Sequence, residues 1–117
     1  MKGLTVIYKI FDIVRVPFPF TDQEKAKLRP ALVISSEKYA AETAHCVLAM
    51  ITTAKNSHWK NDLIIDDFQS ANLPVPSKIR FKIFTLDNRF IVDKLGILDK
   101  KTSLLLKRSL NSIFEIN

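Results

Sequence analysis

The sequence predicts a β-rich α+β fold, in which a small, strongly bent antiparallel sheet or partly open barrel precedes a C-terminal helix. Three observations support this prediction. About five or six short apolar or alternating segments are separated by polar connections, helical periodicity is strong only near the C-terminus, and the 117 residues include only two glycines. So few glycines leave little room for a flexible linker, and we expect residues 1–117 to form a single domain.

The expected strands begin near the N-terminus and follow one another closely. Four short apolar runs are typical of strands: residues 12–18, 30–35, 45–52 and 62–65. The first run contains Pro17 and is followed by Pro19, and neither proline can donate a hydrogen bond to a central ladder. The second and third runs are apolar almost throughout, which favours strands buried on both faces. Between them, residues 37–42 are expected to form one or two helical turns.

The clearest periodicity lies in residues 77–84. Three cations alternate there with three apolar side chains: Lys78, Arg80 and Lys82 with Ile79, Phe81 and Ile83. Because successive side chains of a strand point to opposite faces, the pattern predicts one apolar face and one face with three positive charges. Residues 90–92 and 94–98 are then expected to form a final hairpin arm or edge strand.

The C-terminal segment has a helical pattern over residues 100–114, and Asp99 is its expected N-cap. Three apolar residues at helical spacing are predicted to pack on the sheet: Leu106, Leu110 and Ile113. Lys107 lies on the opposite side of the same helix, and we expect it to be exposed.

The composition favours a basic protein without a disulfide framework. Eighteen Lys and Arg against twelve Asp and Glu give a net charge of +6, which suits nucleic acid, an anionic membrane surface or an acidic protein, or simply serves solubility. The lone cysteine, Cys46, lies in an apolar run and is expected to be a buried, inert thiol. His45 and His58 do not have metal-ligand spacing, so we expect no metal and no cofactor. No run approaches the ~18 apolar residues of a membrane span, and no signal peptide is evident, which favours a cytoplasmic protein.

Arg29 and Thr52 are the sharpest candidates for chemistry. Arg29 precedes Pro30, and a residue before proline is restricted to extended backbone at the entrance of a strand. Its planar, permanently charged fork suits a phosphate or a developing phosphorane. Thr52 ends a strand, where its hydroxyl can donate to a phosphate. The alternatives are an ion pair of Arg29 with an acidic residue of the preceding loop, Glu24 or Asp22, and a β-forming role for Thr52.

Basic and aromatic residues elsewhere are consistent with nucleic-acid binding. Lys25 and Lys27 alternate with Arg29 ahead of the second strand, and the cations of residues 77–84 share a predicted face. Phosphate contacts by such side chains and stacking of bases on Phe18, Phe20 or Trp59 are known modes of single-strand binding. The alternative is that the charged faces are solvated and that Phe18 and Phe20 belong to the core.

The chain resembles the MazF/PemK family of toxin ribonucleases over nearly its full length after residue 11. The similarity is carried by four blocks in order: Asp12-Ile-Val-Arg-Val-Pro-Phe-Pro-Phe-Thr-Asp22, Leu28-Arg-Pro-Ala-Leu-Val-Ile34, Ala49-Met-Ile-Thr-Thr53, and Pro76-Ser-Lys-Ile-Arg80 running into Lys82-Ile-Phe-Thr-Leu-Asp87. The resemblance implies an SH3-like β-barrel with a C-terminal helix, a homodimer, and cleavage of single-stranded RNA at short specific sequences without a metal. It also implies an antitoxin partner, often acidic in the segment that binds the toxin.

By the same resemblance, Arg29 falls on the family's catalytic arginine, Thr52 on its strand-end threonine, and Arg80 on a strand arginine implicated in phosphate or transition-state contact. The implied reaction is attack of an RNA 2′-hydroxyl on the adjacent phosphate, which leaves a cyclic phosphate and a 5′-hydroxyl. Residues of the two neighbouring loops and of the basic strand are the expected RNA-binding set: Thr21, Lys25, Lys27, Thr53, Lys55, Trp59, Lys78 and Lys82.

Two departures from the family pattern stand out. Phe11 replaces the usual glycine before the first strand, which suggests a different approach into that strand, and Lys82 replaces an acidic residue found in some relatives. Two other functions stay open at this point. One is a gyrase-poisoning toxin of the CcdB type, which shares the barrel and the dimer but does not need Arg29 and Thr52. The other is a non-catalytic barrel that binds nucleic acid or an acidic peptide.

Overall fold

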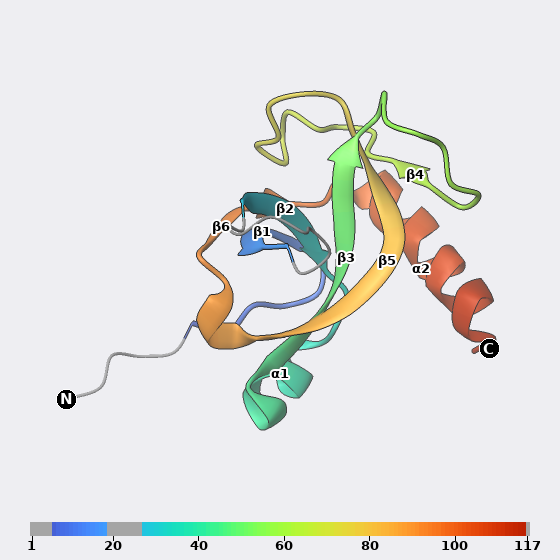
Figure 1. Cartoon of the computed structure of the whole chain (residues 1–117). Helices are drawn as coiled ribbons and strands as arrows, with labels where there is room; N and C mark the ends of the chain where they lie inside the picture. Colours follow the sequence, from blue (N-terminus) through green and yellow to red (C-terminus); the bar gives the residue numbers. More distant parts are fainter. Residues whose placement is uncertain (1–5, 19–26, 117) are drawn as a thin grey trace.

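The computed structural model describes residues 6–18 and 27–116. Within them, six strands form one antiparallel sheet in the order β4-β5-β3-β2-β1-β6. The sheet curls around an apolar interior, and α2 lies against its outer side next to β5 (Figure 1). A curled sheet of short strands with a terminal helix confirms the predicted fold class.

The element bounds follow the predicted order closely. They are β1 (Asp12–Pro17), β2 (Leu28–Val33), α1 (Glu37–Thr43), β3 (His45–Thr53), β4 (Leu63–Ile64), β5 (Ser77–Asp87), the 3₁₀ turn η1 (Asn88–Phe90), β6 (Asp93–Ile97) and α2 (Lys100–Phe114). The main difference is at residues 90–92, where a hairpin arm was expected. The side chain of Asp87 accepts a hydrogen bond from the Arg89 amide (2.8 Å), and this cap starts a 3₁₀ turn in place of a strand.

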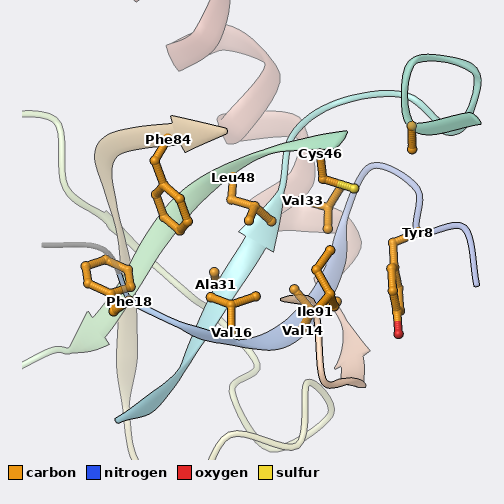
Figure 2. Close-up of a cluster of buried hydrophobic side chains, with 11 residues drawn as sticks. Tyr8, Val14, Val16, Phe18, Ala31, Val33, Cys46, Leu48, Phe84 and Ile91 are labelled. Atoms are coloured by element: carbon orange, nitrogen blue, oxygen red, sulfur yellow. The ribbon is translucent and has the colours of Figure 1, made fainter. Parts of the chain in front are cut away.

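Alternate residues of the central strands fill two apolar clusters on opposite faces of the sheet. Val33 and Leu48 belong to the cluster inside the curl (Figure 2), whereas Leu32 and Ala49 belong to the cluster beneath α2. All four are fully buried, which confirms that β2 and β3 are covered on both faces. Phe18 packs edge-on against Phe84 in the inner cluster, with ring centroids 5.3 Å apart, so it is a core residue and not a stacking platform for bases.

Strand β5 departs from the strict alternation that its sequence predicts. Ala49 of β3 pairs with Ile83, but the next residue, Met50, pairs with Arg80, so one step on β3 spans three steps on β5. This bulge bends β5 and breaks the expected row of cations (Figure 1). The expectation of one solvent-facing stripe is therefore wrong. Lys78 and Arg80 are only 3% and 6% exposed, because the segment between β3 and β4 covers them.

The C-terminal helix begins as predicted, with the Asp99 carboxylate accepting a hydrogen bond from the Thr102 amide (2.8 Å). Leu106 is fully buried and Leu110 packs partly against the same cluster. The prediction for Ile113 is wrong: it is 37% exposed, because Leu110 is the last residue of the helix that reaches the cluster beneath it. Lys107 is exposed, as expected, and its ammonium lies 5.6 Å from the centre of the Phe11 ring.

Phe11 has a positive φ of 79°, a backbone conformation that favours glycine and costs most other residues about 1–2 kcal/mol. Two hydrogen bonds hold this conformation: the Phe11 amide donates to the Val33 carbonyl, and the Leu98 amide donates to the Phe11 carbonyl (both 2.9 Å). The ring packs against the cluster beneath α2. The side chain therefore offsets the backbone strain of the entry into β1.

Gly96 of β6 lies where the backbone of the segment between β4 and β5 comes very close. A Cβ atom at this position would stand 2.5 Å from the carbonyl oxygen of Ala71, which belongs to the backbone and cannot rotate away. We expect Gly96→Ala to lower the free energy of unfolding by about 1–3 kcal/mol, measured by denaturant unfolding. The matched control is Ile97→Thr on the exposed side of the same strand, which should change it by less than ~0.5 kcal/mol. Equal stability of the Gly96→Ala protein would contradict this close approach.

Candidate active site

A cavity of about 360 Å³ lies where the ends of β1, β2 and β3 meet the segment that leads into β5. Its lining includes polar side chains: Arg15, Arg29, Thr52, Thr53, Asn56, Asn72 and Ser77. Apolar side chains complete the lining: Pro30, Ile51, Leu73, Pro74, Val75 and Leu95. Cationic and apolar side chains in one cavity suit a ligand with both an anionic group and a flat, weakly polar group.

The sheet register brings Arg29 and Thr52 together, although 22 residues separate them in the chain. Ala31 pairs with Met50 in the last pair of the β2–β3 ladder. Arg29 lies two residues before Ala31 and Thr52 two residues after Met50, so both lie beyond this end of the ladder, and both line the cavity. Arg29 is exposed, and among residues 6–18 and 27–116 it has no hydrogen-bond or ion-pair partner. Its two alternative partners, Asp22 and Glu24, lie outside the described residues. The Arg29 guanidinium thus presents its donors at the cavity.

The hydroxyl of Thr52 is held by Asn56, a residue that the sequence did not single out. The Asn56 amide nitrogen Nδ2 donates to Thr52 Oγ1 at 2.7 Å. Asn56 follows Thr52 by four residues, on a turn closed by the bond from the Asn56 amide to the Thr53 carbonyl (3.1 Å). Asparagine is a common turn residue, so the sequence signalled a turn here but not its contact with Thr52.

Arg15 also lines the cavity without having been predicted, but its charge is shared. Its Nε and Nη2 donate to the two carboxylate oxygens of Asp93 at 2.8 and 2.6 Å, a bidentate pair at the surface. The hydrogen bond from Arg15 and its charge hold the pKa of Asp93 below its usual range. Of the two arginines that line the cavity, Arg29 is therefore the one whose charge is not neutralised by a carboxylate of the described residues.

Outside the lining of the cavity, a carboxylate with a buried side chain joins two of the three cations of β5. We call Asp62, Lys78 and Arg80 the Asp62 cluster. Arg80 donates Nε to Asp62 Oδ1 at 3.1 Å and Nη2 to Oδ2 at 2.8 Å, and Lys78 Nζ lies 3.2 Å from Oδ2. Burial raises the pKa of Asp62, but bonds from Arg80, the Trp59 amide and Lys78 outweigh that effect and lower the pKa well below its usual range.

The two cations also hold the backbone between β3 and β4. Lys78 Nζ donates to the carbonyl oxygens of Asn56 and Ser57 at 2.9 and 3.1 Å, and Arg80 donates to the Ser57 carbonyl as well. The Arg80 guanidinium lies 5.0 Å from the centre of the Trp59 ring. With Asp62 and loop carbonyls as partners and their side chains covered, these residues are placed to hold a loop and not to contact a phosphate in solvent.

The remaining predicted site residues are distributed unevenly. Thr53 lines the cavity, Lys27, Lys55 and Trp59 are exposed on the surface, and Lys82 is half-buried beside the bulge of β5. Thr21 and Lys25 lie outside the described residues, as does Phe20. Cys46 is buried, with its thiol 3.2 Å from Asn88 Oδ1, and burial raises its pKa. In the described part of the chain, no group of three or more His, Cys, Asp or Glu side chains is arranged to hold a metal ion, and no helix is both long and apolar enough to cross a membrane.

The Asp62 cluster makes a prediction about stability. Asp62→Asn leaves two buried cations without their counter-ion, and we expect it to lower the free energy of unfolding at neutral pH by about 3–5 kcal/mol. The control is Asp66→Asn, which removes an exposed ion pair with Lys101 (3.4 Å) and should cost ~0–1 kcal/mol. Urea unfolding of both variants measures the difference.

The pH dependence follows from the lowered pKa of Asp62 in the folded protein. The unfolded chain binds a proton at this carboxylate near pH 4, while the folded protein does not, so the stabilisation is present above about pH 4 and is lost as the pH falls further. The acid loss of stability should therefore be smaller in Asp62→Asn than in the wild type. An identical acid profile in the two proteins would contradict the coupling.

Comparison with known proteins agrees with the fold and with the order of these elements. Residues 9–114 match the model of the family described as PemK-like, MazF-like toxin of type II toxin–antitoxin system. MazF from Deinococcus radiodurans has a TM-score of 0.74 at 19% identity, over 95% of this chain and 99% of that one. An endoribonuclease in complex with its cognate antitoxin from a mycobacterial species has a TM-score of 0.73 at 17% identity, over 94% and 97%.

A third similar structure is a MazE–MazF complex from Deinococcus radiodurans, with a TM-score of 0.75 at 17% identity over 96% of this chain and 100% of that one. No curated protein sequence matches the chain. At these identities the solved structures establish the fold, and the family model covers nearly the whole sequence. The chain belongs to the family of PemK-like, MazF-like toxins of type II toxin–antitoxin systems.

Proposed function

We propose that this protein is a toxin that acts as an endoribonuclease, cleaving single-stranded RNA at short specific sequences in the cytoplasm without a metal. The observation that carries the proposal is the cavity that Arg29 and Thr52 line together, where Arg29 has no partner among the described residues and Asn56 holds the Thr52 hydroxyl. Membership of the MazF-like family supports the reaction class, and a similar structure is titled an endoribonuclease. The apolar side chains in the lining of the same cavity suit a nucleotide base next to a bound phosphate.

In the proposed reaction, the 2′-oxygen of one nucleotide attacks the phosphorus of the adjacent phosphodiester. The 2′-hydroxyl loses its proton, the bond from phosphorus to the 5′-oxygen breaks, and that oxygen takes up a proton. The products are a 2′,3′-cyclic phosphate and a 5′-hydroxyl. Negative charge builds up on the non-bridging oxygens in the transition state. Arg29 would stabilise this charge through its fixed positive fork, and Thr52 would donate a hydrogen bond to one of these oxygens.

The predicted roles of Arg80 and Lys78 change in this proposal. Both donate to Asp62 and to loop carbonyls and are buried, so we assign them to holding the segment between β3 and β4. Thr53, which lines the cavity, and the exposed Lys27, Lys55 and Trp59 remain the proposed RNA contacts. Thr21, Lys25 and Lys82 keep that role only as sequence-based proposals.

The decisive experiment incubates the purified protein with a long unstructured RNA in the presence of a chelator and maps the 5′-hydroxyl ends. We expect cuts at a recurring short sequence, and we expect Arg29→Ala to abolish them because the transition-state charge loses its permanent cation. Arg29 is exposed and unpaired among the described residues, so the variant should unfold at the same denaturant concentration as the wild type.

Normal cleavage by a folded Arg29→Ala protein would contradict the assignment of this cavity as the active site. If folded, antitoxin-free wild type makes no cuts, two other functions take precedence. Inhibition of gyrase would then identify the CcdB-type alternative, and RNA binding without cleavage would identify a non-catalytic binding module.

The partners are proposed on the same basis. The +6 net charge, and a similar structure of an endoribonuclease in complex with its cognate antitoxin, support an antitoxin with an acidic toxin-binding segment. The family resemblance supports a homodimer.

We expect a short acidic protein encoded next to this chain to co-purify with it and to suppress RNA cleavage. For the dimer, we expect sedimentation of the free toxin to give twice the mass of the 117-residue chain. Co-expression that neither shifts the toxin's mobility nor relieves growth arrest would count against that antitoxin, and a monomer mass would contradict the dimer.

A further inference from the structure

The cavity contains a side chain, Asn56, whose position depends on the buried Asp62 cluster. The backbone carbonyl of Asn56 accepts a hydrogen bond from Lys78 Nζ at 2.9 Å, and the neighbouring Ser57 carbonyl accepts from both Lys78 and Arg80. Lys78 and Arg80 are in turn held by Asp62. The backbone of the segment that carries Asn56 is thus anchored to strand β5 by buried, charged donors, which are stronger than neutral ones.

The side chain of this anchored residue turns back to Thr52. Its amide nitrogen donates to Thr52 Oγ1 at 2.7 Å, a short bond for a neutral pair. A hydroxyl has one proton to donate and two lone pairs that accept. With one lone pair of Thr52 occupied by Asn56, the hydroxyl oxygen is fixed, and its proton remains available for an acceptor in the cavity that both residues line. A donor to a hydroxyl oxygen also strengthens the bond that this hydroxyl donates.

We propose that Asn56 is a positioning residue for RNA cleavage: it fixes the Thr52 hydroxyl as a donor toward the phosphate that Arg29 binds. This inference rests on the proposed function and adds to it a residue that acts through Thr52. Asn56 supplies no proton and forms no bond to the reacting atoms. It contributes by orienting the Thr52 hydroxyl, which would otherwise rotate and donate its hydrogen bond to water.

The test is a double-mutant cycle on Asn56 and Thr52, measured with enzyme in excess over a short RNA that contains one mapped cut site. We expect Asn56→Ala to lower the saturating rate about tenfold, the effect of one lost hydrogen bond. The dissociation constant for the same RNA with a 2′-deoxy residue at the cut should change less than about twofold. In the Thr52→Val background, adding Asn56→Ala should cause no further loss, because the group that Asn56 orients is already absent.

Two further variants sharpen the result. Asn56→Asp keeps the size of the side chain but can only accept, so it should draw the Thr52 proton away from the cavity and lower the rate at least as much as Asn56→Ala. The matched control is Asn72→Gly, which removes another amide of the same cavity, one that donates to the Leu95 carbonyl at 2.7 Å. Asn72 has a φ of 59°, which glycine accommodates, and its effect should multiply with that of Thr52→Val.

The outcomes separate this inference from the proposed function. A wild-type rate in Asn56→Ala, or losses from Asn56→Ala and Thr52→Val that multiply, would overturn the role of Asn56 while leaving the nuclease intact. Non-additivity of equal size in the Asn72 cycle would show a general change of rate-limiting step and would overturn it as well. Cleavage that is absent in the wild type, or unchanged in Arg29→Ala, would overturn the proposed function itself. Denaturant unfolding confirms that each variant is folded, and the exposed side chain of Asn56 makes that expectation secure.

Discussion

The ion pair of Asp62 with two buried cations is the interaction on which the geometry of the candidate site depends. Lys78 and Arg80 lie on the strand that pairs with β3, and their donors reach the carbonyl oxygens of the segment after β3. Two buried positive charges without a counter-ion would be very costly, so these contacts exist only because Asp62 returns to the same place. One carboxylate therefore fixes the path of the loop that ends at one side of the cavity.

The second determinant is the register of the curled sheet. Arg29 precedes the apolar part of β2 and Thr52 follows that of β3, so neither is needed to build the core. The antiparallel pairing of Ala31 with Met50 nevertheless brings them to the same end of the two strands, where both line the cavity. Core residues at the centre of the strands thus determine the distance between polar residues at the ends. This is why an arginine with no described partner and a threonine hydroxyl can share a cavity without either one contributing much to stability.

The sequence predicted the sheet, the terminal helix and the pair of residues at the strand ends, because apolar periodicity and strand-end position are local signals. It did not predict the state of Lys78 and Arg80. Alternation with Ile79 indicated a solvated face, but the segment between β3 and β4, which tertiary contacts hold in place, covers both side chains. Asn56 was missed for a related reason: its contact with Thr52 depends on a turn whose shape Lys78 and Arg80 determine from 22 and 24 positions away.

Arg29 and Arg80 differ in burial and in partners, and this difference changes how loss of activity in their variants should be interpreted. Arg29 is exposed and has no described partner, so its removal changes the chemistry of the cavity while the fold remains. Arg80 is buried against Asp62 and the Ser57 carbonyl. We therefore expect its removal to leave Asp62 paired with Lys78 alone, to release the loop and to displace Asn56. Under the proposed function, we expect both substitutions to stop RNA cleavage, the first because the cavity loses a positive charge and the second because the loop that carries Asn56 is released. Inactivity of an Arg80 variant is therefore no evidence of contact between Arg80 and a phosphate, and only a variant that keeps the stability of the wild type reports on the reaction.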